Sequence, residues 1–341
     1  VDEGIPVITW QEFQGAVLQK GKFTICIAGG YGKSTTTAMI SKILINANFD
    51  PTCELGAKVL EWEKNFRIGK SKYYICEADE YNDNFLNYSP DIAVILNVAW
   101  DHPDFFPNKA SVLLSYKNFI NNIKKNGELV ITTQAYGQLQ KGIREDIMVR
   151  LIKNFPNVKL SLIGDFRAEN ANAALTLAKA LKLNVNQAEK SLETFKGLAR
   201  RLEYKGEIQG IKFYDDYAVQ PYTILKTANA LCHKYPKSKI TLVLEPHTYS
   251  RVNKFFKEFV EAIKNTNVDR VLITNTYPAR EMGDAQRTSK KLAAAVGKKC
   301  IFTGNTVQTA TYIKEKLNSF DIICFMGAGD IYKLYDLVKN G

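Results

Sequence analysis

The sequence predicts an α/β protein in which mostly parallel sheets are covered by helices. Short apolar runs of strand length alternate with runs of helical spacing along the 341 residues. One such run, Lys22–Ala28, enters a glycine-rich turn that a helical pattern follows at once. Strands that alternate with helices build parallel sheets with both faces covered. The length is enough for two or three domains of roughly 100–200 residues each.

The first series of elements precedes a boundary expected near Gly197–Arg200. Apolar residues recur at helical spacing within Ser34–Asn48, which predicts a helix. Ala168–Leu181 is alanine-rich and is also expected to be helical. The strands expected in this series are Lys22–Ala28, Tyr73–Cys76 and Ile92–Val98.

A second series begins near Glu203. Glu203–Ile208 and Ile211–Tyr214 flank Gln209–Gly210, a pattern typical of a β-hairpin. The strands expected after it, with helices between them, are Ile240–Leu244, Arg270–Thr274, Cys300–Phe302 and Ile322–Met326.

The composition narrows the classes of function. A net charge of +11 favours an acidic partner, and nucleotide phosphates satisfy that as well as nucleic acid does. No block of Lys and Arg is long enough for a nucleic-acid arm, so no nucleic-acid partner is expected. The apolar runs are too short to span a membrane. The six cysteines form no C-x-x-C pair, which indicates free thiols in a reducing cytoplasm.

The most informative motif is the segment Gly29–Thr37, which reads GGYGKSTTT between an expected strand and an expected helix. Glycines let backbone N–H groups curl around phosphate oxygens, and the new helix directs its positive end at the same anion. Lys33 can reach the β- and γ-phosphates, and the Ser34 hydroxyl can ligate Mg²⁺. The spacing is the short form G-x-x-G-K-S. The alternative is a plain glycine turn with capping hydroxyls.

Two further motifs follow expected strands. Glu77–Glu80 reads EADE, and a carboxylate at a strand end can hold the Mg²⁺ that bridges phosphates. The alternative is a solvated acidic loop. Asn97–Asp104 reads NVAWDHPD and holds His102, one of only three histidines. Taken alone, His102 is either a metal ligand or a buried, hydrogen-bonded histidine, with the second slightly favoured.

Together these three motifs resemble the central domain of the Mur ligases. Four later segments narrow the resemblance to those members that join L-alanine to UDP-N-acetylmuramate. They are Phe195–Glu203, Asp215–Ala218, Glu245–Arg251 and Met326–Ile331. The resemblance extends from about Ile5 to the C-terminus.

The resemblance implies a domain organisation. Residues 1–20 are expected to be the linker remnant of a uridine-nucleotide-binding domain that the chain lacks. Residues 21–198 would form a central P-loop ATPase domain with a mostly parallel sheet. Residues 199–341 would form a Rossmann-like α/β C-terminal domain. A cytoplasmic enzyme of peptidoglycan biosynthesis is expected, acting as a monomer or homodimer on small-molecule substrates without membrane insertion.

The resemblance also implies a mechanism: ATP converts the lactyl carboxylate of UDP-N-acetylmuramate into an acyl phosphate, which the amine of L-alanine attacks. The catalytic residues would be Lys33, Glu77, His102 and Arg201. The nucleotide would contact Gly29, Gly30, Gly32, Lys33, Ser34, Thr35, Asn170, Arg201 and Asp216. Mg²⁺ would be held by Ser34, Glu77 and His102, and the amino acid would face Tyr217, His247 and Arg251.

The chain also departs from the family pattern. Gly30–Tyr31 replaces the usual Thr-His, Phe166–Arg167 replaces His-Asn, and Val219–Gln220 replaces His-His. Thr248 stands where arginine is usual. Two alternatives therefore stay open. One is a Mur-type ligase with a different amino-acid or peptide acceptor, and the other is a catalytically degenerate ATP-binding regulatory protein.

Overall fold

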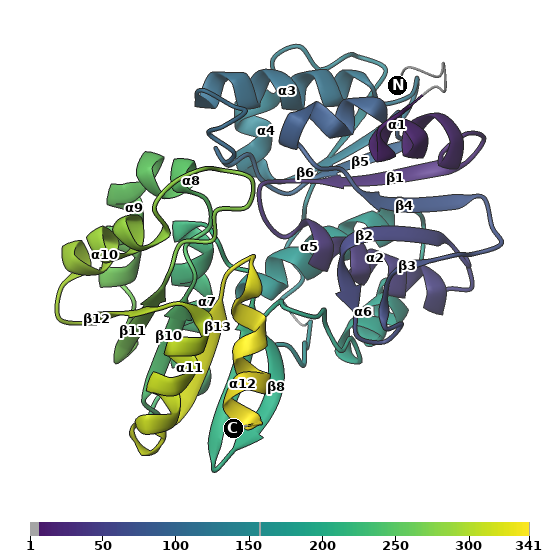
Figure 1. The fold of residues 1–341 in the computed structure, drawn as a ribbon. Helices are drawn as coiled ribbons and strands as arrows, with labels where there is room; N and C mark the ends of the chain where they lie inside the picture. The colour runs from purple at the N-terminus through teal and green to yellow at the C-terminus, as the bar shows by residue number, and fades with distance from the viewer. Residues whose placement is uncertain (1–6, 157, 341) are drawn as a thin grey trace. The chain divides into compact units, whose positions relative to one another are not determined.

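The computed structural model describes residues 7–156 and 158–340, which divide into two compact units. The N-terminal unit takes the chain up to Leu162 together with Arg167–Leu198. The C-terminal unit takes Ile163–Phe166 and the chain from Ala199 onward. Each unit contains one sheet and its own helices, so each is described by itself (Figure 1).

The N-terminal unit is built on a seven-stranded sheet in the order β3-β2-β4-β1-β5-β6-β7. Every neighbouring pair is parallel except β2 with β3, which confirms the predicted, mostly parallel sheet. The strands are β1 (Phe23–Ala28), β2 (Thr52–Val59), β3 (Lys64–Arg67), β4 (Tyr73–Glu77), β5 (Ile92–Ile95), β6 (Glu128–Ile131) and β7 (Met148–Leu151).

Alternate side chains of β1 explain why helices cover both faces of this sheet. Ile25 and Ile27 belong to a buried cluster with residues of α2, α5 and α6. Cys26 and Ala28 belong to a second cluster with residues of η2, α3 and α4. The helices are α1 (Trp10–Phe13), π-helical η1 (Gln14–Leu18), α2 (Lys33–Asn46), 3₁₀-helical η2 (Tyr81–Asn87), α3 (Lys109–Asn121), α4 (Thr133–Leu139), α5 (Phe166–Ala180) and α6 (Val185–Glu193).

The C-terminal unit contains a six-stranded sheet in the order β12-β11-β10-β13-β9-β8. All neighbours are parallel except β8 with β9, the predicted hairpin, which is confirmed. Gln209 and Gly210 both have positive φ, at 48° and 82°, as a tight hairpin turn of this hand requires. The strands are β8 (Glu203–Ile208), β9 (Ile211–Asp216), β10 (Ile240–Leu244), β11 (Arg270–Thr274), β12 (Cys300–Gly304) and β13 (Ile322–Met326).

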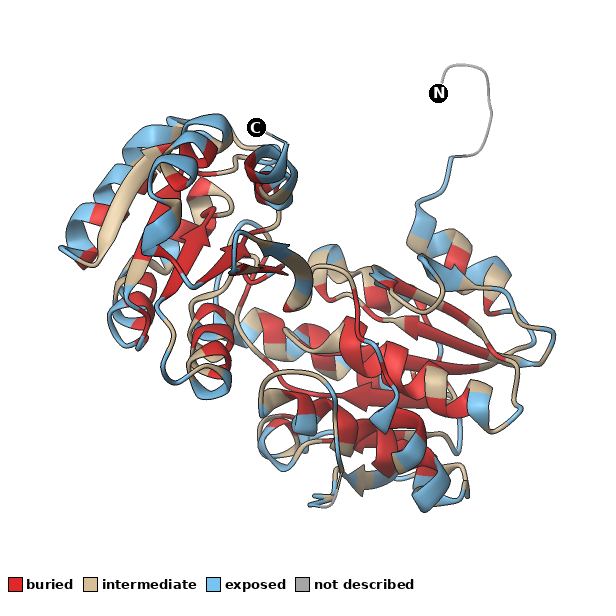
Figure 2. Cartoon of the chain, turned by 90° about the horizontal axis from the view of Figure 1, so that it is seen from below, coloured by how far each residue is buried: buried red, intermediate tan, exposed pale blue. Residues whose placement is uncertain are grey.

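Helices also cover both faces of the second sheet, whose inner strands β11, β10, β13 and β9 are largely buried (Figure 2). Cys324 and Met326 of β13 pack with residues of α7, α9 and α10, whereas Ile323 and Phe325 pack with residues of α11 and α12. The helices are α7 (Pro221–Lys234), α8 (Tyr249–Lys254), α9 (Phe256–Lys264), α10 (Ala285–Val296), α11 (Thr306–Glu315), 3₁₀-helical η3 (Leu317–Ser319) and η4 (Asp330–Lys333), and α12 (Leu334–Lys339). Among the helices of residues 7–156 and 158–340, none has the length and apolar character needed to cross a membrane.

Candidate functional site

Three sequence motifs of the N-terminal unit follow three adjacent parallel strands. In the sheet, β1 lies between β4 and β5, with Ile27 opposite Glu77 and Ala28 opposite Ile95. Parallel strands end at the same edge of a sheet, where ligands of open α/β proteins bind. The segment Gly29–Ser34, here called the phosphate loop, therefore lies beside Glu77–Glu80 and the segment that follows β5.

The phosphate loop needs its glycines. Gly29 and Gly32 have φ of 150° and 87°, values that side chains disfavour. A Cβ atom at Gly30 would lie 2.8 Å from the Ala99 Cβ, and one at Gly32 would lie 2.7 Å from Asn170 Oδ1. The loop thus packs closely on its neighbours and leads directly into α2, whose first-turn N–H groups have no partner within the helix.

Asn97 fixes the shape of the phosphate loop. Its Nδ2 donates a hydrogen bond to the Tyr31 carbonyl at 2.9 Å, and its Oδ1 accepts one from the Tyr31 N–H at 3.3 Å. The side-chain amide thus pairs with both polar groups of one backbone residue. Sequence analysis placed Asn97 in a motif but gave it no role, because this contact joins residues 66 positions apart.

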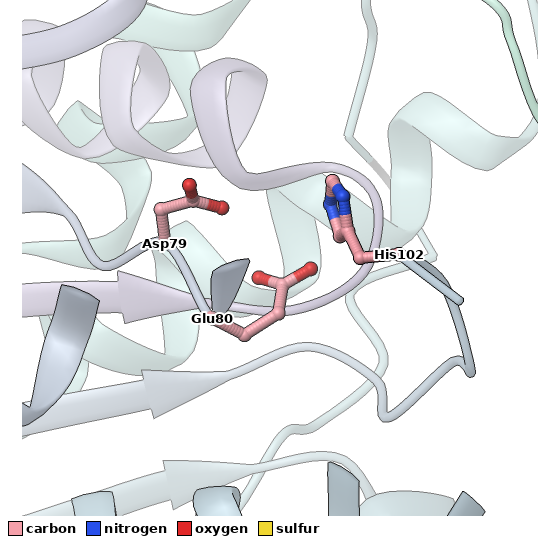
Figure 3. A group of neighbouring side chains, drawn as sticks. All are labelled: Asp79, Glu80 and His102. Atoms are coloured by element: carbon pink, nitrogen blue, oxygen red, sulfur yellow. The ribbon is translucent and has the colours of Figure 1, made fainter. Parts of the chain in front are cut away.

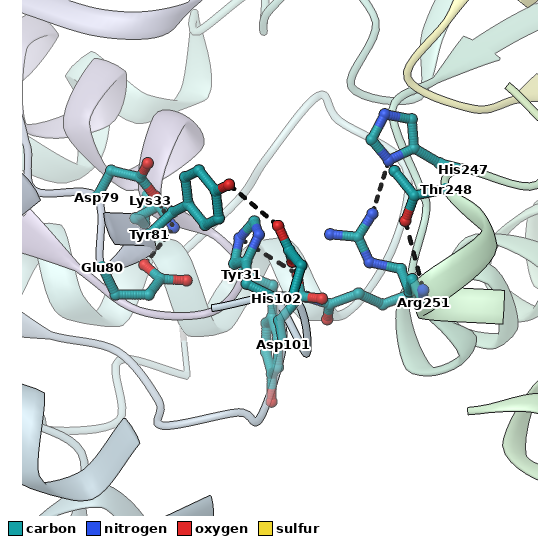
Figure 4. Close-up of polar contacts among 12 residues, drawn as sticks. Tyr31, Lys33, Asp79, Glu80, Tyr81, Asp101, His102, His247, Thr248 and Arg251 are labelled. Atoms are coloured by element: carbon teal, nitrogen blue, oxygen red, sulfur yellow. Dashed lines mark hydrogen bonds and ion pairs between the residues drawn. The ribbon is translucent and has the colours of Figure 1, made fainter. Parts of the chain in front are cut away.

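The ammonium of Lys33 is held by carboxylates. Its Nζ lies 2.7 Å from Glu80 Oε2 and 3.5 Å from Asp79 Oδ1 (Figure 4). Burial lowers the pKa of Lys33, but the negative charges of Glu80 and Asp79 outweigh burial and hold that pKa above its ordinary value. Lys33 is therefore positively charged, as a lysine that clamps phosphates must be.

Asp79, Glu80 and His102 form a carboxylate–histidine group suited to a metal ion (Figure 3). One ligand atom from each lies within 4.8 Å of the other two. Glu80 is 2% exposed, and among the described residues its buried Oε1 has no hydrogen-bond partner. A buried carboxylate oxygen without a donor is a natural ligand for a cation such as Mg²⁺.

Sequence analysis grouped His102 with Ser34 and Glu77 instead. Glu77 ends β4 and is not part of the carboxylate–histidine group, although its charge acts on Lys33. Its Oε2 accepts the Gly56 N–H, and its buried Oε1 has no hydrogen-bond partner within the described part of the chain. Ser34 is buried in the first turn of α2. The structure thus adds Asp79 and Glu80 to the candidate metal ligands.

His102 is held in an unusual backbone conformation. Its φ is 53°, and its Nε2 lies 3.6 Å from Asp101 Oδ2. The ring packs on that of Tyr81, with centroids 4.6 Å apart, and the Tyr81 hydroxyl donates to Asp104 at 3.0 Å (Figure 4). Positive φ at a non-glycine residue costs free energy and is common at functional sites.

The first turn of α5 packs on the first turn of α2. The Thr36 hydroxyl donates to Asn170 Oδ1 at 3.3 Å, and Arg167 Nη1 donates to Thr35 Oγ1 at 3.0 Å. Asn170 and Arg167 are 8% and 4% exposed. The structure thus places Asn170 and Arg167 beside the phosphate loop and the start of α2. The resemblance implied only that Asn170 contacts the nucleotide, and Arg167 was noted only as a departure from the family pattern.

The nucleotide contacts predicted in the C-terminal unit lie at the end of β9 and just before β8. Asp216 ends that strand and is buried, and the Arg201 guanidinium lies 4.8 Å from the ring centre of Tyr217. Burial raises the pKa of the neighbouring Asp215 to about 6, even though Arg200 lowers it.

His247 and Arg251 form a pair in the C-terminal unit. Thr248 caps α8, and Arg251 Nη1 lies 2.6 Å from His247 Nδ1 (Figure 4). The His247 ring stacks on Tyr277 with centroids 5.8 Å apart. Arg251 is 5% exposed. The structure thus brings together two of the three residues expected to face the amino acid.

Comparison with known protein families gives two matches. The Mur ligase middle domain matches residues 27–153, and the glutamate ligase domain of Mur ligases matches residues 200–329. Relatives named UDP-N-acetylmuramate–L-alanine ligase extend across nearly the whole chain. That of Caldicellulosiruptor bescii is 35% identical over 96% of this chain and 78% of the relative. That of Clostridium tetani is 34% identical over 98% and 79%.

Solved structures share the fold. A UDP-N-acetylmuramate-alanine ligase from Thermotoga maritima superposes with a TM-score of 0.76 at 21% identity, covering 96% of this chain and 77% of that one. A MurF ligase from Thermotoga maritima in complex with ADP gives a TM-score of 0.74 at 17% identity, covering 100% and 86%.

Proposed function

The chain belongs to the Mur ligase family, and we propose that it uses ATP to join L-alanine to the lactyl carboxylate of UDP-N-acetylmuramate. The relatives that match across nearly the whole chain support this choice of substrates. The observation that carries the proposal is the charged Lys33, paired with Glu80 of the carboxylate–histidine group. These are the parts that a phosphoryl-transfer site requires.

In the first half-reaction, the lactyl carboxylate attacks the γ-phosphorus of ATP, ADP leaves and an acyl phosphate forms. The phosphate loop would bind the phosphates through backbone N–H groups and Lys33. Positioning and charge neutralisation supply most of the catalysis in such transfers. Gly29, Gly30, Gly32, Ser34 and Thr35 would line the phosphates, and Asn170 would lie at the same helix end.

Mg²⁺ would neutralise phosphate charge in this reaction. Glu77 and Glu80 each offer a buried oxygen that has no hydrogen-bond partner among the described residues, so the residues present fit the ion. We propose Ser34, Glu77 and His102 as ligands, with Asp79 and Glu80 added from the geometry of the carboxylate–histidine group.

In the second half-reaction, the amine of L-alanine attacks the acyl carbon and phosphate leaves. Arg251 would bind the amino-acid carboxylate, because its planar guanidinium fits a carboxylate with two hydrogen bonds. The contact with His247 orients that guanidinium. Tyr217 would also face the amino acid, while Arg201 and Asp216 would contact the nucleotide. We further propose that the enzyme works in the cytoplasm as a monomer or homodimer.

Phosphate release tests the proposal. The chain would be supplied with ATP, Mg²⁺, UDP-N-acetylmuramate and each of the twenty amino acids in turn. We expect phosphate release only when both UDP-N-acetylmuramate and L-alanine are present, with one amide product formed for each phosphate released. Faster phosphate release with another amino acid would identify that amino acid as the acceptor. ATP binding without turnover for any acceptor would favour a regulatory ATP-binding protein.

A further inference from the structure

Arg167 is a buried cation at the edge of the phosphate loop. It is the second residue of α5 and is only 4% exposed. Its Nη1 donates to the hydroxyl of Thr35, in the first turn of α2, at 3.0 Å. Arg167 thus places a buried positive charge beside the first turn of α2, next to the loop where phosphates would bind.

Arg167 lies on the face of α5 that meets the phosphate loop. Asn170 follows three positions later and so projects from the same face. Its Oδ1 accepts the Thr36 hydroxyl at 3.3 Å and would lie 2.7 Å from a Cβ at Gly32. Helix α2 begins at Lys33. Asn170 lies close to Gly32, just before this residue, and both Arg167 and Asn170 contact residues just after it.

Arg167 and Lys33 approach α2 from different sides. Thr35 comes two residues after Lys33, which places the two side chains about 200° apart around the helix. Lys33 turns towards Glu80 and Asp79, whereas Arg167 bonds to Thr35. The first turn of α2, whose N–H groups have no partner within the helix, begins at Lys33 and contains Thr35.

We propose that Arg167 binds the phosphate nearest the nucleoside, the α-phosphate of ATP, while Lys33 binds the terminal phosphates. The inference rests on the proposed use of ATP. Arg167 lies in the first turn of its own helix and beside the first turn of α2, where both helix dipoles disfavour a cation and attract an anion. A guanidinium beside a phosphate resolves this conflict with two parallel hydrogen bonds.

Competition against a fluorescent ADP derivative tests the proposal. ATP, ADP, AMP and adenosine would be titrated against the unmodified chain and Arg167→Ala, Arg167→Asn and Arg167→Lys variants. AMP and adenosine differ only in the α-phosphate. In the Ala and Asn variants, AMP, ADP and ATP are expected to bind about 10- to 100-fold more weakly, since each charge-assisted pair is lost. Adenosine should stay within about twofold, and Lys should restore part of the loss because it keeps the charge.

Two controls separate binding from support of the fold. Lys179→Ala removes an exposed cation in the last turn of α5 and should change no affinity. Arg144→Ala removes an arginine of the same unit that pairs with Asp146 at 2.9 Å, outside the phosphate loop, so it should keep the preference for AMP over adenosine. Thermal unfolding without nucleotide would show whether each variant is folded. If Arg167→Ala does not fold, Arg167→Asn and Arg167→Lys still decide the question.

Several outcomes would overturn the assignment. An equal loss for adenosine and AMP would make Arg167 a structural or nucleobase contact. A loss for ATP with AMP unchanged would assign it to the terminal phosphates. The same loss of AMP affinity in Arg144→Ala and Arg167→Ala would show that the effect does not depend on a cation at the phosphate loop. Failure of the unmodified chain to bind ADP would instead contradict the proposed function.

Discussion

The Lys33 ammonium lies 2.7 Å from the Glu80 carboxylate, and this pair joins the phosphate loop to the acidic motif after β4. Glu80 is buried and offers a second oxygen without a hydrogen-bond partner in the described residues. A triphosphate bound to the loop would compete with Glu80 for Lys33. Glu80 would then be available to a cation that arrives with the nucleotide, so one residue links phosphate binding to metal binding.

Replacing Lys33 with alanine is expected to abolish ATP turnover, with a loss of at least about 100-fold, because the charge that neutralises the phosphates is removed. Phosphate release would be measured at saturating ATP. Lys42→Ala is the matched control, since Lys42 lies on the same helix and pairs with Glu61 at 2.7 Å. Turnover in the Lys33 variant equal to that of the control would contradict the assignment.

Replacing Glu80 with glutamine is expected to raise the Mg²⁺ concentration needed for half-maximal turnover by about tenfold or more, because a charged ligand becomes neutral. Turnover would be titrated with Mg²⁺ at fixed ATP. Asp104→Asn serves as control, because Asp104 accepts from Tyr81 outside the carboxylate–histidine group. An unchanged Mg²⁺ requirement would exclude Glu80 as a ligand.

The fold was predictable where local patterns were strong. Buried strands such as β1 are mostly apolar runs, and the hairpin of β8 and β9 turns at Gln209–Gly210, where Gly210 suits positive φ. Four strands of the first sheet were not predicted. Strand β2 mixes polar residues and Gly56 with apolar ones, and β6 is only four residues long. The short edge strands β3 and β7 consist mostly of exposed residues and show no apolar alternation. Edge strands are defined by the backbone of their neighbours, which local composition does not reveal.

The site was predictable only in part, because some of its contacts join residues that are far apart in the sequence. The phosphate loop is a local motif, so its residues could be named from the sequence. The metal ligands could not all be chosen from the sequence. Glu77, Asp79 and Glu80 stand in one short motif, and the direction of each carboxylate depends on the backbone conformation after β4. The contact of Arg167 with Thr35 joins residues 132 positions apart and depends on how α5 packs on α2.

Replacing Arg251 with alanine is expected to raise the KM for L-alanine about 10- to 100-fold, because a charge-assisted contact to the amino-acid carboxylate is lost. The affinity for ATP should change little. Initial rates would be measured against L-alanine at saturating ATP and UDP-N-acetylmuramate. Arg280→Ala, on the same unit but in the loop before α10, is the comparison variant. A loss of ATP affinity with an unchanged KM for L-alanine would contradict this role.

The last prediction concerns Glu54 on β2 and the dependence of stability on pH. Its Oε2 accepts a hydrogen bond from Gln14 Nε2 at 3.0 Å. Burial, and then the negative charge of Glu77, raise the pKa of Glu54 from 4.5 to about 7, although the bond from Gln14 lowers it. Folded Glu54 therefore keeps its proton to higher pH than unfolded Glu54. Between about pH 4.5 and 7 the folded state binds more protons, so the free energy of unfolding falls as the pH rises through this window.

Glu54→Gln should remove this contribution, because glutamine keeps the shape and the acceptor oxygen but carries no charge at any pH. At pH 8 the variant should be more stable than the unmodified chain, by at most about 3 kcal/mol, since each pKa unit corresponds to about 1.4 kcal/mol. At pH 4.5 the two should be nearly equal. Thermal unfolding midpoints at both pH values would measure the difference, which amounts to several degrees.

Glu193→Gln, at an exposed position on α6, should shift neither midpoint. A Glu54→Gln variant that is no more stable than the unmodified chain at pH 8 would show that the Glu54 carboxylate is ionised in the folded protein without cost.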